Sequence, residues 1–434
     1  MTQINNANKT KNIILCSDGT GNKGGAGAET NVFQLYNAID IHDPALEQVV
    51  FYENGVGTQK NKIIKGISGA FGFGFGQNVK DLYEFLVRQY EPGDNIYMFG
   101  FSRGAATIRG FAGFLQICGL VDKFKKNTNG DYALDVDGHK VFKCDEELGR
   151  EMDEAFCCYQ KNDPNSPQTP HQAEQFKAKT ALHHETFVPN GNVPIKFIGV
   201  WDTVSALGFP DGLSPLAGSI MATFQGIINR CCPHLFYNYQ LNENVKHVFH
   251  ALSLDDERRT FHPKVWREIP KPDEPLERPK NIEQVWFAGM HSNVGGGYTR
   301  KGLSNVTFDW MLERAQLHGL KFISGFCENI KERVNVHGRL YDSRDGLAFY
   351  YRYAPRNLPQ LCTESGKIAS DEIKIHNSVL SRMKYRTSEY APAEFPREFK
   401  VVSSSVDDAD TGHSDTIDNL ITHKAPPFLG AFHS

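Results

Sequence analysis

A serine in a glycine-flanked turn is the first feature of this sequence that could support covalent chemistry. Residues 100–104 read G-F-S-R-G and match the pattern G-x-S-x-G, in which a strained strand-to-helix turn lifts the serine hydroxyl above a sheet. An apolar strand pattern precedes the turn and a helical pattern follows it, and Gly100 and Gly104 remove side chains that would collide there. The alternative is a tight turn with a surface serine. We predict that Ser102 is a nucleophile.

A serine hydroxyl is a weak nucleophile, so it needs a general base and a group that orients the base. With this motif the partners follow in the chain order serine, acid, histidine. Asp202 ends the strand pattern at 195–200, and His291 follows the strand pattern at 284–287 and precedes a glycine-rich turn. The order and positions predict His291 as the base and Asp202 as the acid.

Other residues compete for both partner positions. Asp202 is also typical of a turn or helix cap, and His291 is chosen by its position, because the chain has 16 histidines. The acidic rivals stand beside two arginines, which is more typical of ion pairs. The competitors are Asp255, Asp256 and Glu257 for the acid, and His250 and His376 for the base.

Acyl transfer also needs backbone donors that face the oxyanion of the tetrahedral intermediate. One donor is expected from the N–H of Arg103, directly after the nucleophile. The other is expected from S-D-G-T-G-N at 17–22, where Asp18 supports the turn, Gly19 allows a close approach and Thr20 adds a hydroxyl. Losing one such donor typically costs about 3 kcal/mol of transition-state stabilisation.

The sequence disfavours two other enzyme classes, because it lacks a residue or motif that each of them requires. Phosphatases with an aspartyl nucleophile read D-x-D-G-T after a strand, but here Cys16 stands where their nucleophile would be. Residues 72–76, G-F-G-F-G, are not a phosphate-binding loop because no G-K-[ST] follows. We interpret them as a loop before a helix or as an apolar rim of the active-site mouth.

The elements that must position these residues alternate along the chain. Strand patterns stand at 12–16, 48–52, 96–99, 195–200 and 284–287. Helical patterns stand at 31–40, 77–90, 103–117, 245–254 and 303–317. This alternation predicts an α/β fold in which helices wrap a parallel sheet. Right-handed crossovers favour a doubly wound, mostly parallel sheet.

Two segments interrupt the alternation. Residues 121–192 are polar, and residues 205–238 are apolar and rich in glycine and proline. We interpret them as insertions at about 121–192 and 205–245, the second being either a lid that meets a lipid surface or a buried cap. Residues 1–400 then form one domain with these insertions, and residues 401–434 form a loosely ordered tail.

Composition excludes several classes of protein. Of 434 residues, 40% are hydrophobic and 23% charged, with a net charge of −4, which is ordinary for a soluble protein and disfavours nucleic-acid binding. Nine scattered cysteines without a C-x-x-C pair disfavour a zinc ribbon and fit reduced thiols in a cytoplasm. The polar N-terminus lacks a signal peptide, and no segment is apolar enough to span a membrane. We expect cytoplasmic synthesis, with export by a route without a cleaved signal left open, and no metal or cofactor.

Several ordered motifs, from about residue 12 to 396, resemble one family. They are S-D-G-T-G-N at 17–22, T-N-V at 30–32, G-V-G-T at 55–58, P-G-D at 92–94, G-F-S-R-G-A at 100–105, W-D-T-V at 201–204, D-E-R-R at 256–259, H-S-x-V-G-G-G-Y at 291–298 and H-x-S-V-x-x-R at 376–382. The chain resembles the α/β-hydrolase family that includes phospholipase effectors of bacterial type VI secretion and many uncharacterised bacterial and fungal proteins.

This resemblance implies an α/β-hydrolase fold that cleaves phospholipid acyl esters through an acyl-enzyme. Carried over by motif, Ser102 is the nucleophile, His291 the base and Asp202 the acid. One departure is Asn293, where the family motif commonly has aspartate. Two other functions stay open: a small-molecule esterase or acyltransferase, and a catalytically weak hydrolase-fold interaction protein, which Asn293 slightly favours. The expected partners are an ester substrate and a membrane surface.

Overall fold

The computed structural model describes residues 10–19, 27–54, 70–161, 170–184, 187, 192–204, 241, 243–268, 282–344, 352–363, 367–369, 372–404 and 414–416. Within these ranges one sheet runs in the order β2-β1-β3-β4-β5-β6-β7-β8-β9. Neighbours from β2 to β8 are parallel, and β9 is antiparallel to β8. The strands are β1 Asn12–Ser17, β2 Gln48–Glu53, β3 Asn95–Phe101, β4 Ile195–Trp201, β5 Val245–Ser253, β6 Ile282–Phe287, β7 Lys374–His376, β8 Glu398–Val402 and β9 Ser414–Thr416.

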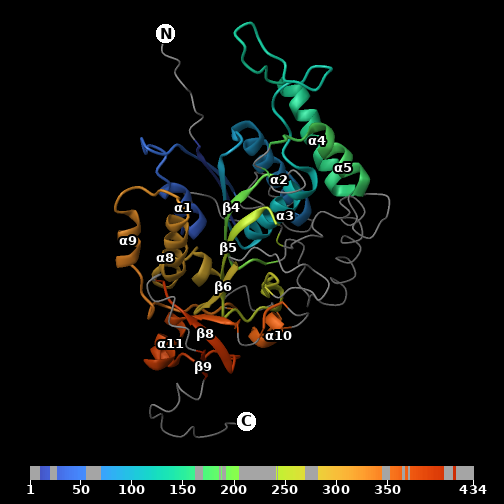
Figure 1. The fold of residues 1–434 in the computed structure, drawn as a ribbon. Helices are drawn as coiled ribbons and strands as arrows, with labels where there is room; N and C mark the ends of the chain where they lie inside the picture. Colours follow the sequence, from blue (N-terminus) through green and yellow to red (C-terminus); the bar gives the residue numbers. More distant parts are fainter. Residues whose placement is uncertain are drawn as a thin grey trace.

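Helices cover both faces of the sheet, which confirms the predicted doubly wound α/β class (Figure 1). On one face lie α1, α8 and α9, and on the other lie α2 and α3 with α4 and α5 outside them. The helices are α1 Asn31–Ala38, α2 Ala70–Gln89, α3 Arg103–Cys118, α4 Asp145–Lys161, α5 Pro170–Thr180, α7 His291–Gly295, α8 Gly302–Leu317, α9 Phe326–Glu332, α10 Leu358–Thr363 and α11 Asn377–Lys384, with 3-10 turns η1 Arg259–Phe261 and η4 Thr387–Glu389.

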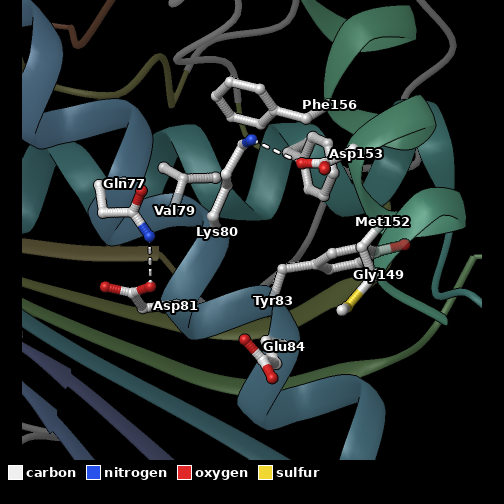
Figure 2. A pocket seen from close by; sticks show the side chains of 11 residues that line it. Gln77, Val79, Lys80, Asp81, Tyr83, Glu84, Gly149, Met152, Asp153 and Phe156 are labelled. Atoms are coloured by element: carbon white, nitrogen blue, oxygen red, sulfur yellow. Dashed lines mark hydrogen bonds and ion pairs between the residues drawn. The ribbon is translucent and has the colours of Figure 1, made fainter. Parts of the chain in front are cut away.

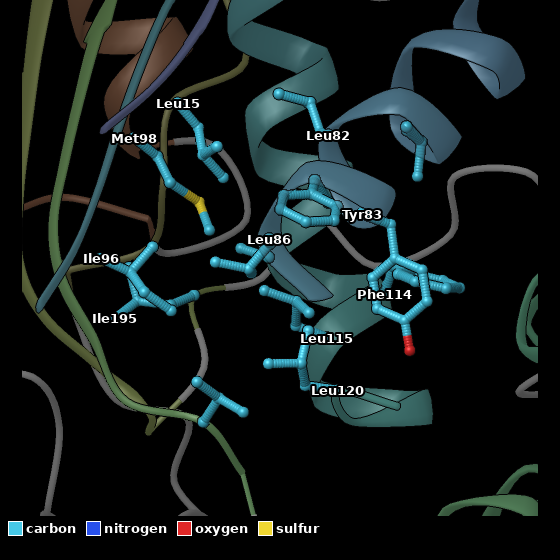
Figure 3. Close-up of a cluster of buried hydrophobic side chains, with 14 of the residues drawn as sticks. Leu15, Leu82, Tyr83, Leu86, Ile96, Met98, Phe114, Leu115, Leu120 and Ile195 are labelled. Atoms are coloured by element: carbon cyan, nitrogen blue, oxygen red, sulfur yellow. The ribbon is translucent and has the colours of Figure 1, made fainter. Parts of the chain in front are cut away.

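The core that fixes the serine turn lies between the sheet and the helices α2 and α3 (Figure 3). Leu82 and Leu86 of α2 and Leu115 of α3 point toward the strand residues Leu15 and Met98. All five are fully buried. Since burying one such side chain contributes about 1.5–3 kcal/mol, this layer holds α3 firmly against the strands that carry the site.

The segment 245–254 is a strand and not the predicted helix. Val245, Val248, Phe249 and Leu252 match a helical stripe, but they belong to β5, between β4 and β6. Every residue from 248 to 253 is buried. A central parallel strand is covered on both faces and so lacks the alternation that marks a half-exposed strand.

The two predicted insertions and the tail are described only in part. In 121–192, isolated bridges such as Phe124↔Phe142 join residues after α3, and α4 and α5 then pack against α3. In 205–245, residues 205–240 and 242 lie outside the described residues. Residues 72–76 belong to α2 and do not form the expected loop before a helix, while the side chains of 72–75 lie outside the described residues. The expected tail contributes the end of β8 and strand β9. The division into a domain of residues 1–400 and a tail stays a prediction.

None of the helices within the described ranges has the length and apolar character needed to cross a bilayer.

Candidate active site

Three predicted residues meet where parallel strands end. Ser102 follows β3, Asp202 follows β4, and His291 begins α7 shortly after β6. His291 Nε2 lies 2.8 Å from Ser102 Oγ, and His291 Nδ1 lies 2.6 Å from Asp202 Oδ2. The structure therefore joins a hydroxyl, an imidazole and a carboxylate in one hydrogen-bonded line, the arrangement that serine acyl transfer uses.

The turn at Ser102 is strained and tightly packed. Its φ of 58° and ψ of −121° are unusual for a residue with a side chain. A Cβ on Gly104 would lie 2.1 Å from the carbonyl oxygen of Ser17, and one on Gly100 would lie 2.7 Å from Ala105 Cα. These clashes confirm that Gly100 and Gly104 are glycines because any side chain there would collide with neighbouring backbone. The backbone N–H of Ser102 also donates to Trp201 O at 3.1 Å, which ties the turn to β4.

Asp202 is fully buried, with four donors on its carboxylate. Oδ1 accepts from the backbone N–H of Ser253 at 3.0 Å and from Arg356 Nη1 at 2.7 Å. Oδ2 accepts from His291 Nδ1 and from Arg356 Nη2 at 2.9 Å. Burial acts to raise the pKa of the Asp202 carboxyl, but the charge of Arg356 and the hydrogen bonds from His291 and Arg356 together hold that pKa below its ordinary value. Asp202 is therefore ionised at neutral pH.

His291 sits in an apolar slot that keeps its ring neutral. The ring centroid lies 4.6 Å from that of Phe101 and 5.0 Å from that of Phe261. Burial lowers the pKa of His291, and the opposing hydrogen bond and charge of Asp202 do not fully offset it. With Nδ1–H donating to Asp202, Nε2 is left to accept the proton of Ser102. A neutral imidazole in this tautomer is the form that a general base requires.

Asp255 and Asp256 anchor the loop that carries His291, and none of the three acidic rivals is hydrogen-bonded to its ring. Asp256 is buried, forms an ion pair with Arg258 at 2.6 Å and accepts from the backbone N–H of His291 at 3.2 Å. Asp255 accepts from the backbone N–H of Gly289 at 2.6 Å and from a tyrosine hydroxyl. Burial raises the pKa of Asp255 to about 6. The backbone N–H of Glu257, the third rival, donates to Ser343 Oγ at 3.3 Å. The ion-pair interpretation holds for Asp256.

The two rival histidines have structural contacts of their own. His250 is buried, with Nε2 3.1 Å from Thr203 Oγ1 and Nδ1 3.3 Å from Gln284 Oε1. His376 caps α11, because its side chain accepts from the backbone N–H of Ser378. Neither ring makes a hydrogen bond to Ser102 within the part of the chain that the structure describes.

Of the predicted oxyanion residues, Arg103 and Asp18 lie at the serine turn, where a Cβ on Gly104 would lie 2.5 Å from Asp18 O. Arg103 follows Ser102 and is the first residue of α3, the position that its predicted role requires. Asp18 is buried, and the backbone N–H of Gly19 donates to its Oδ1 at 2.6 Å. Asp18 Oδ2 accepts from Tyr52 OH at 2.7 Å and from a threonine hydroxyl. Asp18 thus shapes the turn. The N–H of Gly19 would have to break its hydrogen bond to Asp18 before it could donate to an oxyanion. Thr20 lies outside the described residues.

Asn293 uses both ends of its amide. Its Nδ2 donates to Arg339 O at 3.1 Å, and its Oδ1 accepts from the backbone N–H of Tyr341 at 3.2 Å. It therefore fastens α7 to the segment 339–341, and neither of these bonds involves the His291 ring. An aspartate would lose the first of these bonds, because a carboxylate has no donor. The departure from the family motif is matched by local partners, which weakens the inactive-scaffold interpretation.

Arg356 is the functional candidate that sequence reasoning missed. It is fully buried, and both of its terminal nitrogens bond to Asp202. The surrounding sequence, Y-R-Y-A-P-R-N-L-P, belongs to no catalytic motif, and arginine at the surface would fit it equally well. Only the three-dimensional structure reveals the pair.

One cavity and one cluster of charged residues lie apart from these residues. A cavity of about 310 Å³ between α2 and α4 is lined by the Lys80–Asp153 ion pair and by Phe156 (Figure 2). It contains none of the residues bonded to Ser102. Among the described residues, the group whose ligand atoms are close enough to share a metal ion is Asp135, Asp137 and His139, all exposed. The backbone of a tight turn accounts for their closeness, since Asp135 Oδ1 accepts from two of its amides.

Comparisons with known proteins place the chain in a family. Residues 11–314 match a family model described as "T6SS, Phospholipase effector Tle1-like, catalytic domain". An uncharacterized protein of Saccharomyces cerevisiae is 25% identical to this chain over an aligned length of 441. The alignment covers 82% of this chain and 63% of that protein. A crystal structure of an uncharacterized protein from Pseudomonas aeruginosa matches with a TM-score of 0.40 and 17% identity, over 76% of this chain and 49% of the other. The chain thus spans less than two thirds of the length of either relative.

Replacing Gly104 with alanine should disrupt the serine turn. The new Cβ would collide with the backbone of Ser17, so α3 has to shift, and we expect a loss of about 1–3 kcal/mol in the free energy of unfolding. Reaction of Ser102 with a fluorophosphonate probe should slow by orders of magnitude. Gly149→Ala in α4 is the matched control, because a Cβ there meets nothing within 4 Å. Wild-type stability and labelling in Gly104→Ala would contradict this account.

The pH dependence of probe labelling should report the lowered pKa of His291. Only the neutral ring accepts the Ser102 proton, so a pKa below 6.5 keeps the base active into mildly acidic solution. We expect the labelling rate to be constant at neutral pH and to fall with a midpoint below 6.5 as the pH is lowered. The rate is measured in buffers of constant ionic strength, with Ser102→Ala as the blank. A midpoint above 6.5 would argue against this environment.

Proposed function

We propose, since this chain belongs to the family of Tle1-like phospholipase effector catalytic domains of type VI secretion, that it is a serine hydrolase of phospholipid acyl esters. Family membership suggests phospholipase or esterase activity. The observation that carries the finer proposal is the line of hydrogen bonds from Ser102 through His291 to Asp202, at 2.8 and 2.6 Å. A neutral base and an ionised acid in that line support the assignment of roles.

The proposed reaction forms an acyl-enzyme. Ser102 Oγ attacks the ester carbonyl carbon while His291 Nε2 takes the hydroxyl proton, and Asp202 stabilises the resulting imidazolium. The N–H of Arg103 and a donor from the segment after Asp18 would hold the oxyanion. His291 then gives its proton to the departing lysophospholipid oxygen as the tetrahedral intermediate collapses.

Water completes the cycle. His291 takes a proton from a water molecule that attacks the acyl carbonyl, and a second tetrahedral intermediate forms. Its collapse breaks the bond to Ser102 Oγ, which regains its proton from His291, and the fatty acid leaves. No cofactor enters these steps, because proton transfer and charge stabilisation are done by side chains and backbone groups.

The phospholipid substrate rests on the family and on the apolar segment 205–245. That segment contains Leu213, Leu216, Ile220, Phe224 and Ile227 among its apolar residues. These five lie outside the described residues, and we propose from their apolar character that they favour binding to a membrane surface. A small-molecule ester would need no such segment. A short-chain soluble ester and a phospholipid vesicle therefore distinguish the two substrate classes.

Ser102→Ala should abolish turnover without unfolding the protein. Removing the nucleophile of a comparable triad lowers kcat by about a millionfold, whereas the change of one oxygen leaves the packing of the turn intact. Fatty-acid release is measured from phosphatidylcholine and phosphatidylethanolamine vesicles and from p-nitrophenyl butyrate, together with the unfolding temperature.

Three outcomes separate the candidate functions. Release from vesicles by wild type and not by Ser102→Ala supports the phospholipase. Turnover of the soluble ester alone favours the small-molecule esterase. If wild type neither hydrolyses these substrates nor reacts with a fluorophosphonate, the interaction-protein interpretation replaces both.

A further inference from the structure

We propose that Arg356 is a positioning residue that keeps Asp202 ionised and aligned with His291, so that the reactive unit is a line of four residues. The inference rests on the proposed function, because it concerns how the proposed acid is held. It adds a residue 42 positions beyond the range that matches the family model, which ends at residue 314.

The guanidinium of Arg356 donates hydrogen bonds to both carboxylate oxygens of Asp202. Nη1 donates to Oδ1 at 2.7 Å and Nη2 donates to Oδ2 at 2.9 Å. The same two nitrogens also donate to the carbonyl oxygens of Ser253 and Phe261. Arg356 therefore joins the ends of β4 and β5 to the turn η1. A planar fork of this kind fixes the plane of a carboxylate as well as its position.

The fixed plane determines where the lone pairs of the Asp202 carboxylate point. An ionised carboxylate has about four acceptor positions, and here four donors occupy them: two from Arg356, one from Ser253 and one from His291. Rotation of the carboxylate would break several bonds at once. Oδ2 is thus held facing Nδ1 of His291 at 2.6 Å.

The charge of Arg356 has a second effect. Asp202 has no exposed surface, and a buried carboxylate without a partner takes up a proton. Protonated Asp202 would no longer stabilise the imidazolium of His291. Arg356 opposes this protonation. Burial acts to lower the pKa of the Arg356 guanidinium, but the charge and hydrogen bonds of Asp202, together with the charges of Asp256 and Asp255, raise that pKa above its ordinary value. Of these three carboxylates, only that of Asp202 receives bidentate hydrogen bonds from Arg356.

A cavity lies beside this arginine. Arg356 lines a cavity of about 410 Å³ that is bounded by the segments 254–257, 340–343 and 390–394. Its walls include the carboxylates of Asp255, Glu257, Asp342 and Glu394. A small cation such as guanidinium is therefore attracted to the space that a shortened side chain at position 356 would leave.

The test compares Arg356→Lys, Arg356→Ala and the control Arg382→Ala, using kcat and KM for p-nitrophenyl butyrate and the fluorophosphonate labelling rate. Lysine keeps the charge but cannot bridge both oxygens, so we expect kcat to fall by about 100-fold with KM nearly unchanged. Arg382 is equally buried but donates to Val336 O and Gly338 O. Its loss should affect stability more than kcat.

Chemical rescue and a double mutant separate positioning from general stability. Guanidinium chloride, far below denaturing concentrations, should raise kcat of Arg356→Ala by about tenfold and leave Arg382→Ala unchanged. In the Asp202→Asn background, Arg356→Lys should cause no further loss, because Arg356 acts through Asp202. If Arg356→Ala does not fold, Arg356→Lys and the double mutant decide the question.

The inference is overturned by a wild-type kcat in Arg356→Lys, or by equal losses from this substitution in the wild-type and Asp202→Asn backgrounds. Failure of the proposed function looks different. In that case the wild type itself shows neither turnover nor labelling, and the inference falls with it. Both proposals are supported by a specific set of results. Wild type is active, the Arg356 variants are impaired, guanidinium rescues Arg356→Ala, and Arg356→Lys causes no further loss in the Asp202→Asn background.

Discussion

The negative charge of Asp202 is the constraint around which the site is built. A carboxylate with no contact with solvent has to be balanced by protein groups alone. Arg356, the amide of Ser253 and the His291 ring together provide that balance. Together with Asp202, these groups come from four separate segments of the chain. The ends of β4 and β5, the start of α7 and the segment before α10 therefore have to be correctly placed at the same time.

Backbone strain at two neighbouring strand ends accompanies this charge. Ser102 and Asp202 both have positive φ, 58° and 39°, although neither is glycine. Their strands pair through Phe101 and Trp201 immediately before the strained residues. Such conformations persist only where the surroundings overdetermine them. Here that support comes from the buried core under α3, from Gly100 and Gly104, which leave room for the neighbouring backbone, and from the ion pair between Asp202 and Arg356.

The sequence allows the fold class and the three site residues to be predicted because both depend on local patterns. Short apolar runs followed by turns identify parallel strands, and Ser102, Asp202 and His291 stand directly after such runs. Strand β5 is misread because it is buried on both faces. Arg356 and the paired amide of Asn293 escape prediction because their partners are distant in sequence. No local pattern distinguishes a surface arginine from one that pairs with Asp202.

The pairing of Asp202 with Arg356 joins residues 154 positions apart. Proteins are made from the N-terminus at about 5–20 residues per second, so Arg356 is added roughly 8–30 s after Asp202. Until then a nascent chain contains the nucleophile, the acid and, later, the histidine, but has no cation to hold the acid. The order of translation thus allows the site to be completed only after residue 356 has been added, well after the nucleophile, the acid and the histidine are present.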